Sequence, residues 1–160
     1  MTFTTVALSK KFKHRYKFIA NIYNIQKKNL EAVTVFLDTG CFNTMIPRRL
    51  AKQTGRSLGF KKNYSIGGSL IETEAFAIEK IIIGNFPIER VIAFAGDYKG
   101  SNEDDIILGT NVINNWDINI SKKEHLFQFC ENPPDDIPNK TNIYQNYFNK
   151  EGNYAFIQDN

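Results

Sequence analysis

Apolar and polar residues alternate over several short stretches of this chain, a pattern typical of half-buried β-strands. The alternation is imperfect from Arg15 to Gln26 and resumes from Val33 to Leu37, after a polar break at residues 27–29. These two stretches predict a hairpin whose second strand runs directly into Asp38.

A second hairpin is expected where glycines separate two strand-like runs. The runs extend from Phe60 to Ile66 and from Leu70 to Ile83, and the glycines Gly67 and Gly68 can adopt the positive φ that a tight turn requires. The other predicted strands are Thr44 to Ile46, Phe86 to Ala95, Ile106 to Leu108, Asp117 to Ser121 and Leu126 to Phe129.

Two short helices are expected between the strands. Pro47 is well placed to open the first helix, and Gly55 supplies its C-terminal stop. Thr110 or Asn111 can cap a second helix that continues through Asn115. The pattern therefore predicts a mainly β fold with one or two short helices.

The chain length of 160 residues suits one domain with a hydrophobic core and is too short for two domains of comparable size. We expect that domain at residues 1–130. Residues 131–160 begin with a proline-rich acidic stretch, which is unsuited to the interior of a strand or helix. They are interpreted as an aromatic tail that is partly disordered or docked on the domain.

Twenty basic and 17 acidic residues leave a net charge of only +3. Aromatic and aliphatic residues interleave with the basic run between Lys10 and Lys17, so this run is interpreted as the solvated face of a strand. No stretch approaches the ~20 apolar residues that cross a bilayer, and the first residues lack the apolar core of a signal peptide. We expect a cytoplasmic protein without nucleic-acid or membrane partners.

Metal or cofactor chemistry is not indicated. The chain has two cysteines, Cys41 and Cys130, and two histidines far apart in sequence, without the spacing of a zinc site. Reduced thiols are the expectation. The adjacent acids Asp104 and Asp105 fall in a polar loop and are interpreted as solvated rather than as a cation site.

The most informative pattern is the run from Val35 to Gly40, in which a hydrophobic strand delivers Asp38 into a turn made by a glycine. An acid at the end of a buried strand is unusual unless it is paired or functional. The Asp-Thr-Gly tripeptide alone is weak evidence of function, since chance produces it in roughly 2% of chains of this length. The motifs around it therefore decide its meaning.

Three further motifs follow Leu37-Asp38-Thr39-Gly40 in a definite order. They are Thr44-Met45-Ile46-Pro47, the pair Gly67-Gly68, and Ile106-Ile107-Leu108-Gly109. This order resembles that of retropepsin-like aspartic proteases, over about residues 30 to 130 of the chain. The resemblance implies a closed β-barrel with one or two short helices.

The resemblance also implies roles for individual residues. Asp38 would be the catalytic carboxylate, and Leu108 and Gly109 would brace its loop from beneath. Thr39 would hydrogen-bond the partner's loop across a dimer axis, and Gly40 would let its amide approach the carboxylate without a Cβ in the way. The flap over bound peptide would be formed by Ile66, Gly67, Gly68 and Ser69.

Peptide hydrolysis by this chemistry needs two adjacent carboxylates, one to activate water and one to protonate the carbonyl oxygen. The chain has a single Asp-Thr-Gly motif and no length for a second lobe. We therefore expect a homodimer that pairs two copies of Asp38 and cleaves extended polypeptides. Two alternatives stay open: a catalytically inactive retropepsin-like module for dimerisation or peptide binding, and nucleic-acid binding through the basic segment.

The sequence departs from the family after the tripeptide. Cys41 stands where alanine or serine is common, and it is interpreted as a buried, inert thiol. Phe42 and Asn43 stand where viral members usually carry acidic residues, so the viral subsite contacts do not transfer. Phe42 either enlarges an apolar subsite or belongs to the core, whereas Trp116 is expected in the core.

Overall fold

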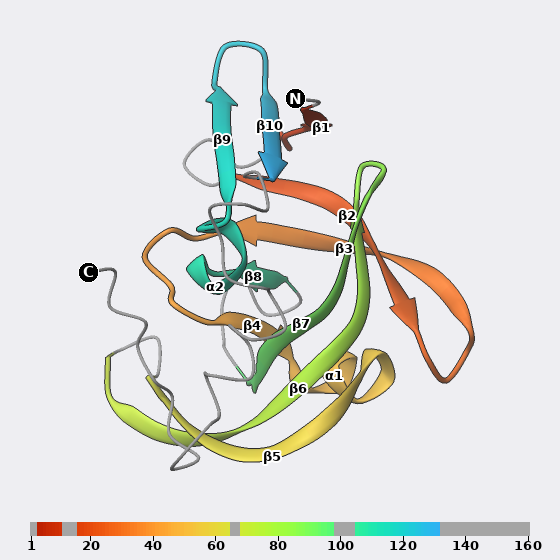
Figure 1. Cartoon of the computed structure of the whole chain (residues 1–160), viewed down its shortest axis with the longest axis vertical. Coiled ribbons are helices and arrows are strands. Elements are labelled where there is room, and N and C mark those ends of the chain that lie inside the picture. Colours follow the sequence, from red (N-terminus) through yellow and green to blue (C-terminus); the bar gives the residue numbers. More distant parts are fainter. Residues whose placement is uncertain (1–2, 11–15, 65–67, 98–104, 132–160) are drawn as a thin grey trace.

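The computed structural model describes residues 3–10, 16–64, 68–97 and 105–131 (Figure 1). These residues form strands connected by turns and two short helices. In chain order the elements are β1 (Thr4–Ala7), β2 (Lys17–Asn24), β3 (Asn29–Leu37), β4 (Thr44–Pro47), α1 (Arg48–Thr54), β5 (Gly55–Tyr64), β6 (Leu70–Ile83), β7 (Phe86–Gly96), β8 (Ile106–Leu108), α2 (Thr110–Ile113), β9 (Trp116–Ser121) and β10 (Leu126–Glu131).

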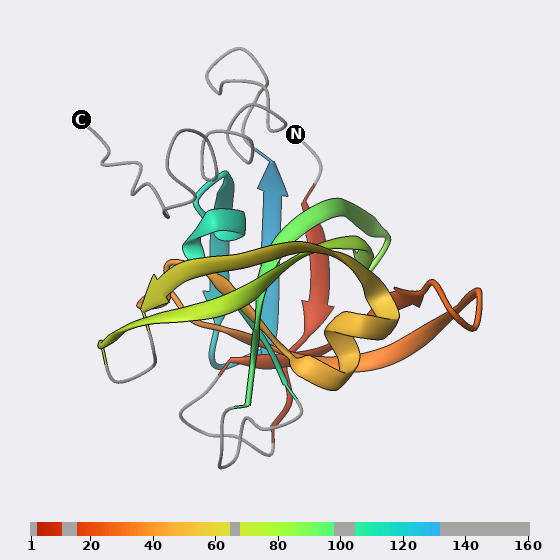
Figure 2. The same cartoon turned by 90° about the horizontal axis from the view of Figure 1, so that it is seen from below.

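Six strands close into a barrel, whose curved wall is visible in Figure 2. Their hydrogen-bonded order is β2-β3-β8-β4-β7-β6, and β6 pairs back onto β2, with Asn21 opposite Ile82 and Ile22 opposite Ile81. The predicted hairpins β2–β3 and β5–β6 are both present. The expected mainly β class, closed barrel and short helices are confirmed.

Strand β5 lies outside the closed ring, because among the described strands it pairs with β6 alone. It begins at Gly55, earlier than the pattern predicts. The pairing register shifts between Ser57 and Gly59, where Gly59 has a φ of +85°. The bulge bends an exposed edge strand that carries Arg56 and Lys62 on its surface.

The wall of the barrel that matters for the site is built around β8, which lies between β3 and β4 (Figure 1). It runs parallel to β3, with Leu108 opposite Leu37, and antiparallel to β4, with Ile107 opposite Met45. All residues of β8 are buried, since both faces of the strand are covered. Because β3 and β4 are consecutive, residues 38–43 must cross the carboxyl end of β8.

Two apolar clusters occupy opposite faces of this wall, because successive side chains of a strand point to opposite sides. Along β7, Val91, Ala93 and Ala95 belong to the main core, whereas Ile92 and Phe94 belong to the second cluster. The second cluster also contains Met45, Ala75 and Ile107, with Phe36, Cys41 and Ala77 packed against it.

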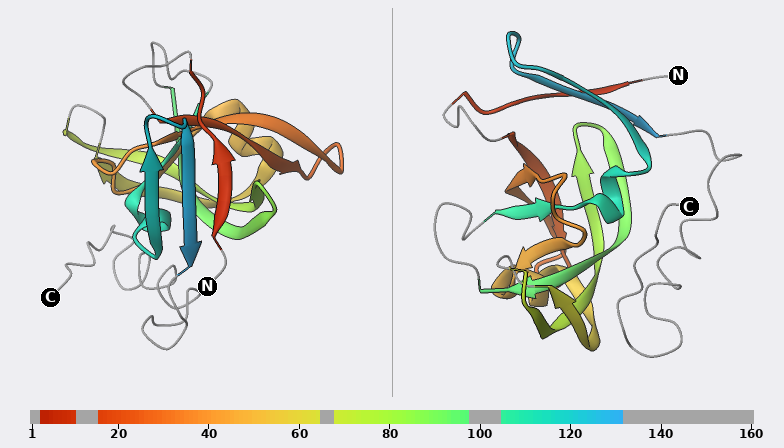
Figure 3. Two further views of the ribbon diagram at one scale, coloured as in Figure 1. Left: turned by 90° about the horizontal axis from the view of Figure 1, so that it is seen from above. Right: turned by 90° about the vertical axis from the view of Figure 1, so that its left-hand side faces the viewer.

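A separate sheet of order β1-β10-β9 packs against the barrel, as the right-hand view of Figure 3 shows. Aromatic rings join the two: Phe18 of β2 stacks on Phe127 with centroids 5.3 Å apart, and Phe86 of β7 meets Phe129 edge to face at 5.4 Å. Trp116 is buried, as expected. Strand β1 was not predicted, because four residues are too few to display a period of two.

Helix α1 follows Pro47 and ends at Thr54, in agreement with the proline and glycine signals. The reason for Gly55 differs from the expected one. Its φ of −146° is extended and requires no glycine. A Cβ at this position would lie 2.8 Å from the carbonyl oxygen of Ala77, so glycine is needed for the close approach of the helix end to β6.

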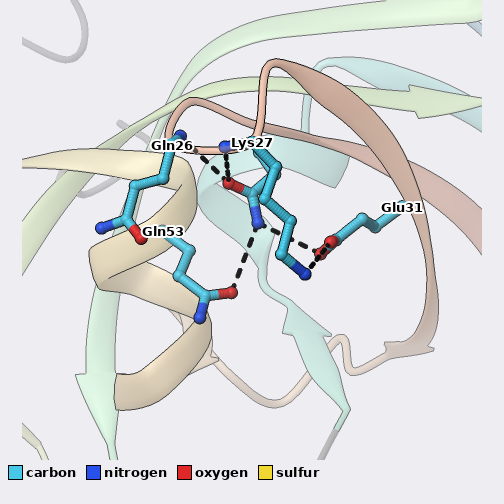
Figure 4. A network of polar contacts seen from close by, with 5 residues as sticks. Gln26, Lys27, Glu31 and Gln53 are labelled. Atoms are coloured by element: carbon cyan, nitrogen blue, oxygen red, sulfur yellow. Dashed lines mark hydrogen bonds and ion pairs between the residues drawn. The ribbon is translucent and has the colours of Figure 1, made fainter.

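Asn24 ties the end of α1 to the turn between β2 and β3 (Figure 4). Its Oδ1 accepts the backbone N–H groups of Gln26 at 3.0 Å and Lys27 at 2.9 Å. Its Nδ2 donates to Glu31 at 3.3 Å and to Gln53 at 3.4 Å. Hydrogen bonds from Lys27 and Asn24 lower the pKa of Glu31, so this carboxylate stays ionised within the network.

The buried ion pair between Lys17 and Asp105 corrects two expectations. Lys17 was assigned to a solvated strand face and Asp105 to a solvated loop, but they are 1% and 7% exposed and their side chains contact each other. Lys17 lies in β2 and Asp105 directly precedes β8, so the pair bridges two elements on either side of β3. Neither charge could be buried at low cost without a partner.

Replacing Lys17 with Met should lower the free energy of unfolding by about 3–5 kcal/mol, because Asp105 would remain as a buried charge without this partner. Urea denaturation followed by circular dichroism measures the change. The double variant Lys17→Met/Asp105→Leu should recover most of the loss, since it removes both charges. A loss below about 1 kcal/mol in the single variant would contradict the role of the pair.

Candidate active site

Asp38 lies one residue beyond the buried end of β3. Its backbone N–H donates to the carbonyl of Leu108 at 3.2 Å, which extends the contact between β3 and β8. Its Oδ1 accepts the backbone N–H of Gly40 at 2.9 Å. The residue remains partly exposed. The carboxylate is therefore fixed at a strand end and still accessible to a reactant.

Thr39 and Gly40 are exposed at the surface of the same loop. A Cβ on Gly40 would lie 3.3 Å from Oδ1 of Asp38, a tighter contact than real Cβ atoms usually make. Glycine thus suits the approach of this amide to the carboxylate, which is the role that the sequence suggests. The hydrogen bond expected of Thr39 is to a partner chain and stays a prediction.

Gly109 supports the loop from beneath by a very close approach. A Cβ at this residue would lie 2.6 Å from the carbonyl carbon of Asn43 and 2.8 Å from the carbonyl oxygen of Cys41. The backbone N–H groups of Thr110 and Asn111 donate to the carbonyls of Cys41 at 2.8 Å and Phe42 at 3.0 Å. The loop thus lies directly on the chain that follows β8.

Asn111 locks this arrangement through a buried polar network. Its Oδ1 accepts the backbone N–H of Thr44 at 2.9 Å and the Thr44 hydroxyl at 2.8 Å, and its Nδ2 donates to the carbonyl of Ile92 at 2.9 Å. The Gly109 N–H donates to the same hydroxyl at 3.2 Å. One side chain therefore joins α2 to β4 and β7.

The predicted cap of α2 was wrong. The N-cap residue is Gly109, and neither Thr110 nor Asn111 makes a side-chain cap. The reason is that Asn111 uses its amide for contacts with β4 and β7. The family resemblance drew attention to Asn111, but its partners lie far away in sequence and no local pattern identifies them.

Cys41 is partly buried, and its Sγ donates to the carbonyl of Asn43 at 2.9 Å. Burial, and to a smaller extent the nearby charge of Asp38, raise the pKa of the Cys41 thiol to about 11. The thiol is therefore protonated at neutral pH. This agrees with the expectation of an inert thiol, because the thiolate is the reactive form.

Phe42 is 55% exposed, so of its two interpretations the core position is wrong. It lies in the loop between Asp38 and β4, and its backbone carbonyl accepts the N–H of Asn111. An exposed aromatic ring beside the carboxylate loop is a surface available to an apolar group of a ligand.

The residues expected to form a flap belong to the β5–β6 hairpin, and two of them, Ile66 and Gly67, lie outside the described residues. Gly68 has a φ of +83°, the conformation predicted for a glycine in the turn, and Ser69 is exposed. Leu70 and Ile71 on the following arm are 60% and 40% exposed. The described arms therefore offer apolar side chains near the turn.

A contact that the sequence did not suggest joins this hairpin to the carboxylate loop. The side chain of Asn43 donates to the side chain of Asn63 in β5, and both residues are buried. Nothing in the sequence links these two asparagines, which are 20 positions apart.

Within the described ranges, no group of three or more His, Cys, Asp or Glu side chains is arranged to hold a metal ion. In the same part of the chain, none of the helices has the length and apolar character needed to span a bilayer.

A closed barrel that presents one Asp-Thr-Gly loop, held at the end of a strand and backed by a glycine, defines an acid-protease type of fold and site. A family model described as aspartyl protease matches residues 24–112, and the chain belongs to this family. The match confirms the retropepsin-like resemblance and supports a protease type of function. A search of the curated proteins gives no match to the chain.

Replacing Asn111 with Leu should lower the free energy of unfolding by about 3 kcal/mol, since each buried polar group that loses its partner costs about 1–3 kcal/mol. The groups affected are the Thr44 N–H and the Ile92 carbonyl. Urea denaturation provides the measurement. Asn114→Ala, an exposed change next to α2, is the control and should stay within about 0.5 kcal/mol. Equal effects of the two changes would contradict the proposed lock.

Cys41 should react slowly with iodoacetamide in the folded protein, because its pKa of about 11 keeps the thiol protonated at pH 8. Labelling measured by mass spectrometry should accelerate as the pH rises toward that value. The Asp38→Asn variant should label faster at a given pH, because one cause of the raised pKa is removed. Labelling at pH 8 as fast as in the unfolded chain would refute the assignment.

Proposed function

We propose that the protein is an aspartic endopeptidase that works as a homodimer, with Asp38 from each protomer forming the catalytic pair. The observation that carries this proposal is the placement of Asp38. It stands at the end of a buried strand, and one of its carboxylate oxygens accepts the Gly40 N–H. Gly109 supports the same loop by its close approach to the backbone of Cys41 and Asn43.

Two carboxylates sharing one proton supply both functions that peptide hydrolysis needs. The ionised carboxylate accepts a proton from water as the water attacks the peptide carbonyl, and the protonated one donates to the carbonyl oxygen. Close like charges keep one of the pair protonated when the other is ionised. The carboxyl that took the proton of water then donates it to the amide nitrogen, which leaves as the tetrahedral intermediate collapses. Because water is the nucleophile, no covalent enzyme intermediate forms.

The second carboxylate must come from another copy of the chain. The sequence holds one Asp-Thr-Gly motif, and Asp105, at the opposite end of β8 from Asp38, is paired with Lys17 in the core. Thr39 is exposed at the tip of the same loop, where its hydroxyl can reach the loop of a partner. A two-fold axis through this loop would place the two Asp38 side chains together.

The substrate that fits this site is an extended polypeptide with apolar residues beside the scissile bond. The exposed rings and aliphatic chains of Phe42, Leu70 and Ile71 offer apolar contacts on the loop and on the hairpin. Backbone groups of the hairpin can hydrogen-bond an extended chain. Neither Cys41 nor Cys130 forms a disulfide with a described residue, as expected for a protein that works in the reducing cytoplasm.

Asp38→Asn should abolish cleavage of a peptide library between mildly acidic and neutral pH, because the amide can neither accept the proton of water nor share a proton with its partner. Mass spectrometry of the products provides the readout. Asp97→Asn is the matched control, since this exposed carboxylate pairs with Arg48 at the surface, and it should retain full activity. Undiminished cleavage by Asp38→Asn would end the assignment.

Sedimentation of the same samples tests the assembly. A dimer is expected at concentrations where cleavage is observed, and a monomer at every concentration would defeat the mechanism. A confirmed dimer that turns over no peptide, yet binds peptide equally well with Asp38→Asn, would identify the inactive module instead.

A further inference from the structure

Asn43 and Asn63 form a buried contact between the carboxylate loop and the β5–β6 hairpin. The two residues are 4% and 3% exposed. Nδ2 of Asn43 donates to Oδ1 of Asn63, and Nδ2 of Asn63 lies 3.7 Å from Sδ of Met45 in the second apolar cluster. Two buried amides that satisfy each other across an apolar cluster are a directional contact, since each loses its partner if the other moves.

The position of Asn63 along the hairpin makes this contact important. Toward the turn, the last pair that joins β6 to β7 is Ala75 opposite Phe94, and the described pairings beyond it join only β5 to β6. The β6 arm is held there by Thr73, whose hydroxyl donates to the carbonyl of Ala95 at 2.6 Å. Asn63 provides the corresponding contact for the β5 arm.

Asn43 is in turn coupled to Asp38 by the loop itself. The carbonyl of Asn43 accepts the Sγ–H of Cys41 at 2.9 Å and lies against the Cα of Gly109. The N–H of Cys41 donates to the carbonyl of Asp38 at 3.2 Å. The backbone of Asn43 is thus tied to the turn that holds the carboxylate, and its side chain carries this connection to Asn63.

We propose that Asn43 and Asn63 are a positioning pair that fixes the arms of the β5–β6 hairpin relative to the Asp38 loop. The consequence for substrate binding rests on the proposed peptidase function. The pair sets the distance between the hairpin and the Asp38 carboxylate, and therefore the space for a bound peptide. The pair does not contact reacting atoms. It sets how tightly substrate is held rather than how the bond is cleaved.

Hydrogen exchange measured by mass spectrometry on the full chain tests the pair without any need for activity. Asn63→Leu should speed exchange in residues 61–64, 70–73 and 39–44 by about 5- to 50-fold, the change expected when one buried hydrogen bond is lost. Ser57→Ala is the matched control, because it removes an exposed hydrogen bond to Glu74 in the same hairpin. The control should leave residues 39–44 unchanged.

A double-variant cycle separates the pair from two independent effects. Asn43→Leu should reproduce the pattern of Asn63→Leu, and the double variant should exchange no faster than the faster single variant, because the same contact is removed once. Additive effects, or unchanged exchange in residues 39–44, would overturn the proposal. If near-ultraviolet circular dichroism shows that Asn63→Leu is unfolded, Asn63→Ser takes its place in the same cycle.

Kinetics add a readout that a loss of stability alone would not produce. In the folded dimer, Asn63→Leu should raise KM about tenfold while kcat changes less than about twofold, because it weakens ground-state and transition-state binding alike. An equal loss in kcat with unchanged KM would contradict the positioning role. If no variant, including the unmodified chain, cleaves peptide, the proposed function fails while the exchange cycle still decides the pair.

Discussion

The close approach of Gly109 to the loop above it is the constraint on which the site depends. The loop joins two strands that flank β8, so it has to pass over the end of that strand at whatever distance residue 109 permits. With glycine there, the carbonyl of Cys41 accepts a hydrogen bond from the chain after β8, and the carbonyl of Asn43 lies against Gly109. A larger residue would lift the loop and Asp38 with it, since the atoms it would meet belong to the backbone.

Buried polar contacts hold this part of the barrel wall at both ends of β8, one beneath the loop at its carboxyl end and one at its start. The amide of Asn111 joins α2 to β4 and β7, and the Lys17–Asp105 pair bridges β2 and the start of β8. Apolar packing alone tolerates small shifts between strands, because it has no direction. Buried hydrogen bonds do not tolerate such shifts, since each lost partner carries a large penalty at low dielectric. The arrangement favours one precise placement of the loop over adaptability.

The sequence predicted those parts of the fold that depend on local pattern. The strands on either side of residues 27–29, the helix after Pro47 and the positive φ of Gly68 follow from alternation and from the chemistry of proline and glycine. The loop around Asp38 was recognised from the order of short motifs. The burial of Lys17 could not be predicted, because its partner lies 88 positions away and both residues sit in polar stretches.

The same limit applies to the candidate site. Asp38, Gly40 and Gly109 were identified from the motif, and the structure places all three in one loop with its support. The hydrogen-bond partners of Asn111 and Asn63 were not identified from the sequence, since a short polar residue in a strand or helix gives no sign of where its amide points. Periodicity reports which face is buried, whereas the identity of a hydrogen-bond partner is fixed only once the barrel closes.

Strand β5 has a consequence for how the molecule meets other chains. As an edge strand it presents unpaired backbone groups, the usual template for unwanted sheet extension. Here the bulge between Ser57 and Gly59 bends that template, and Arg56 and Lys62 place charge along it. These two features discourage fibre-like growth along the outer edge of the hairpin.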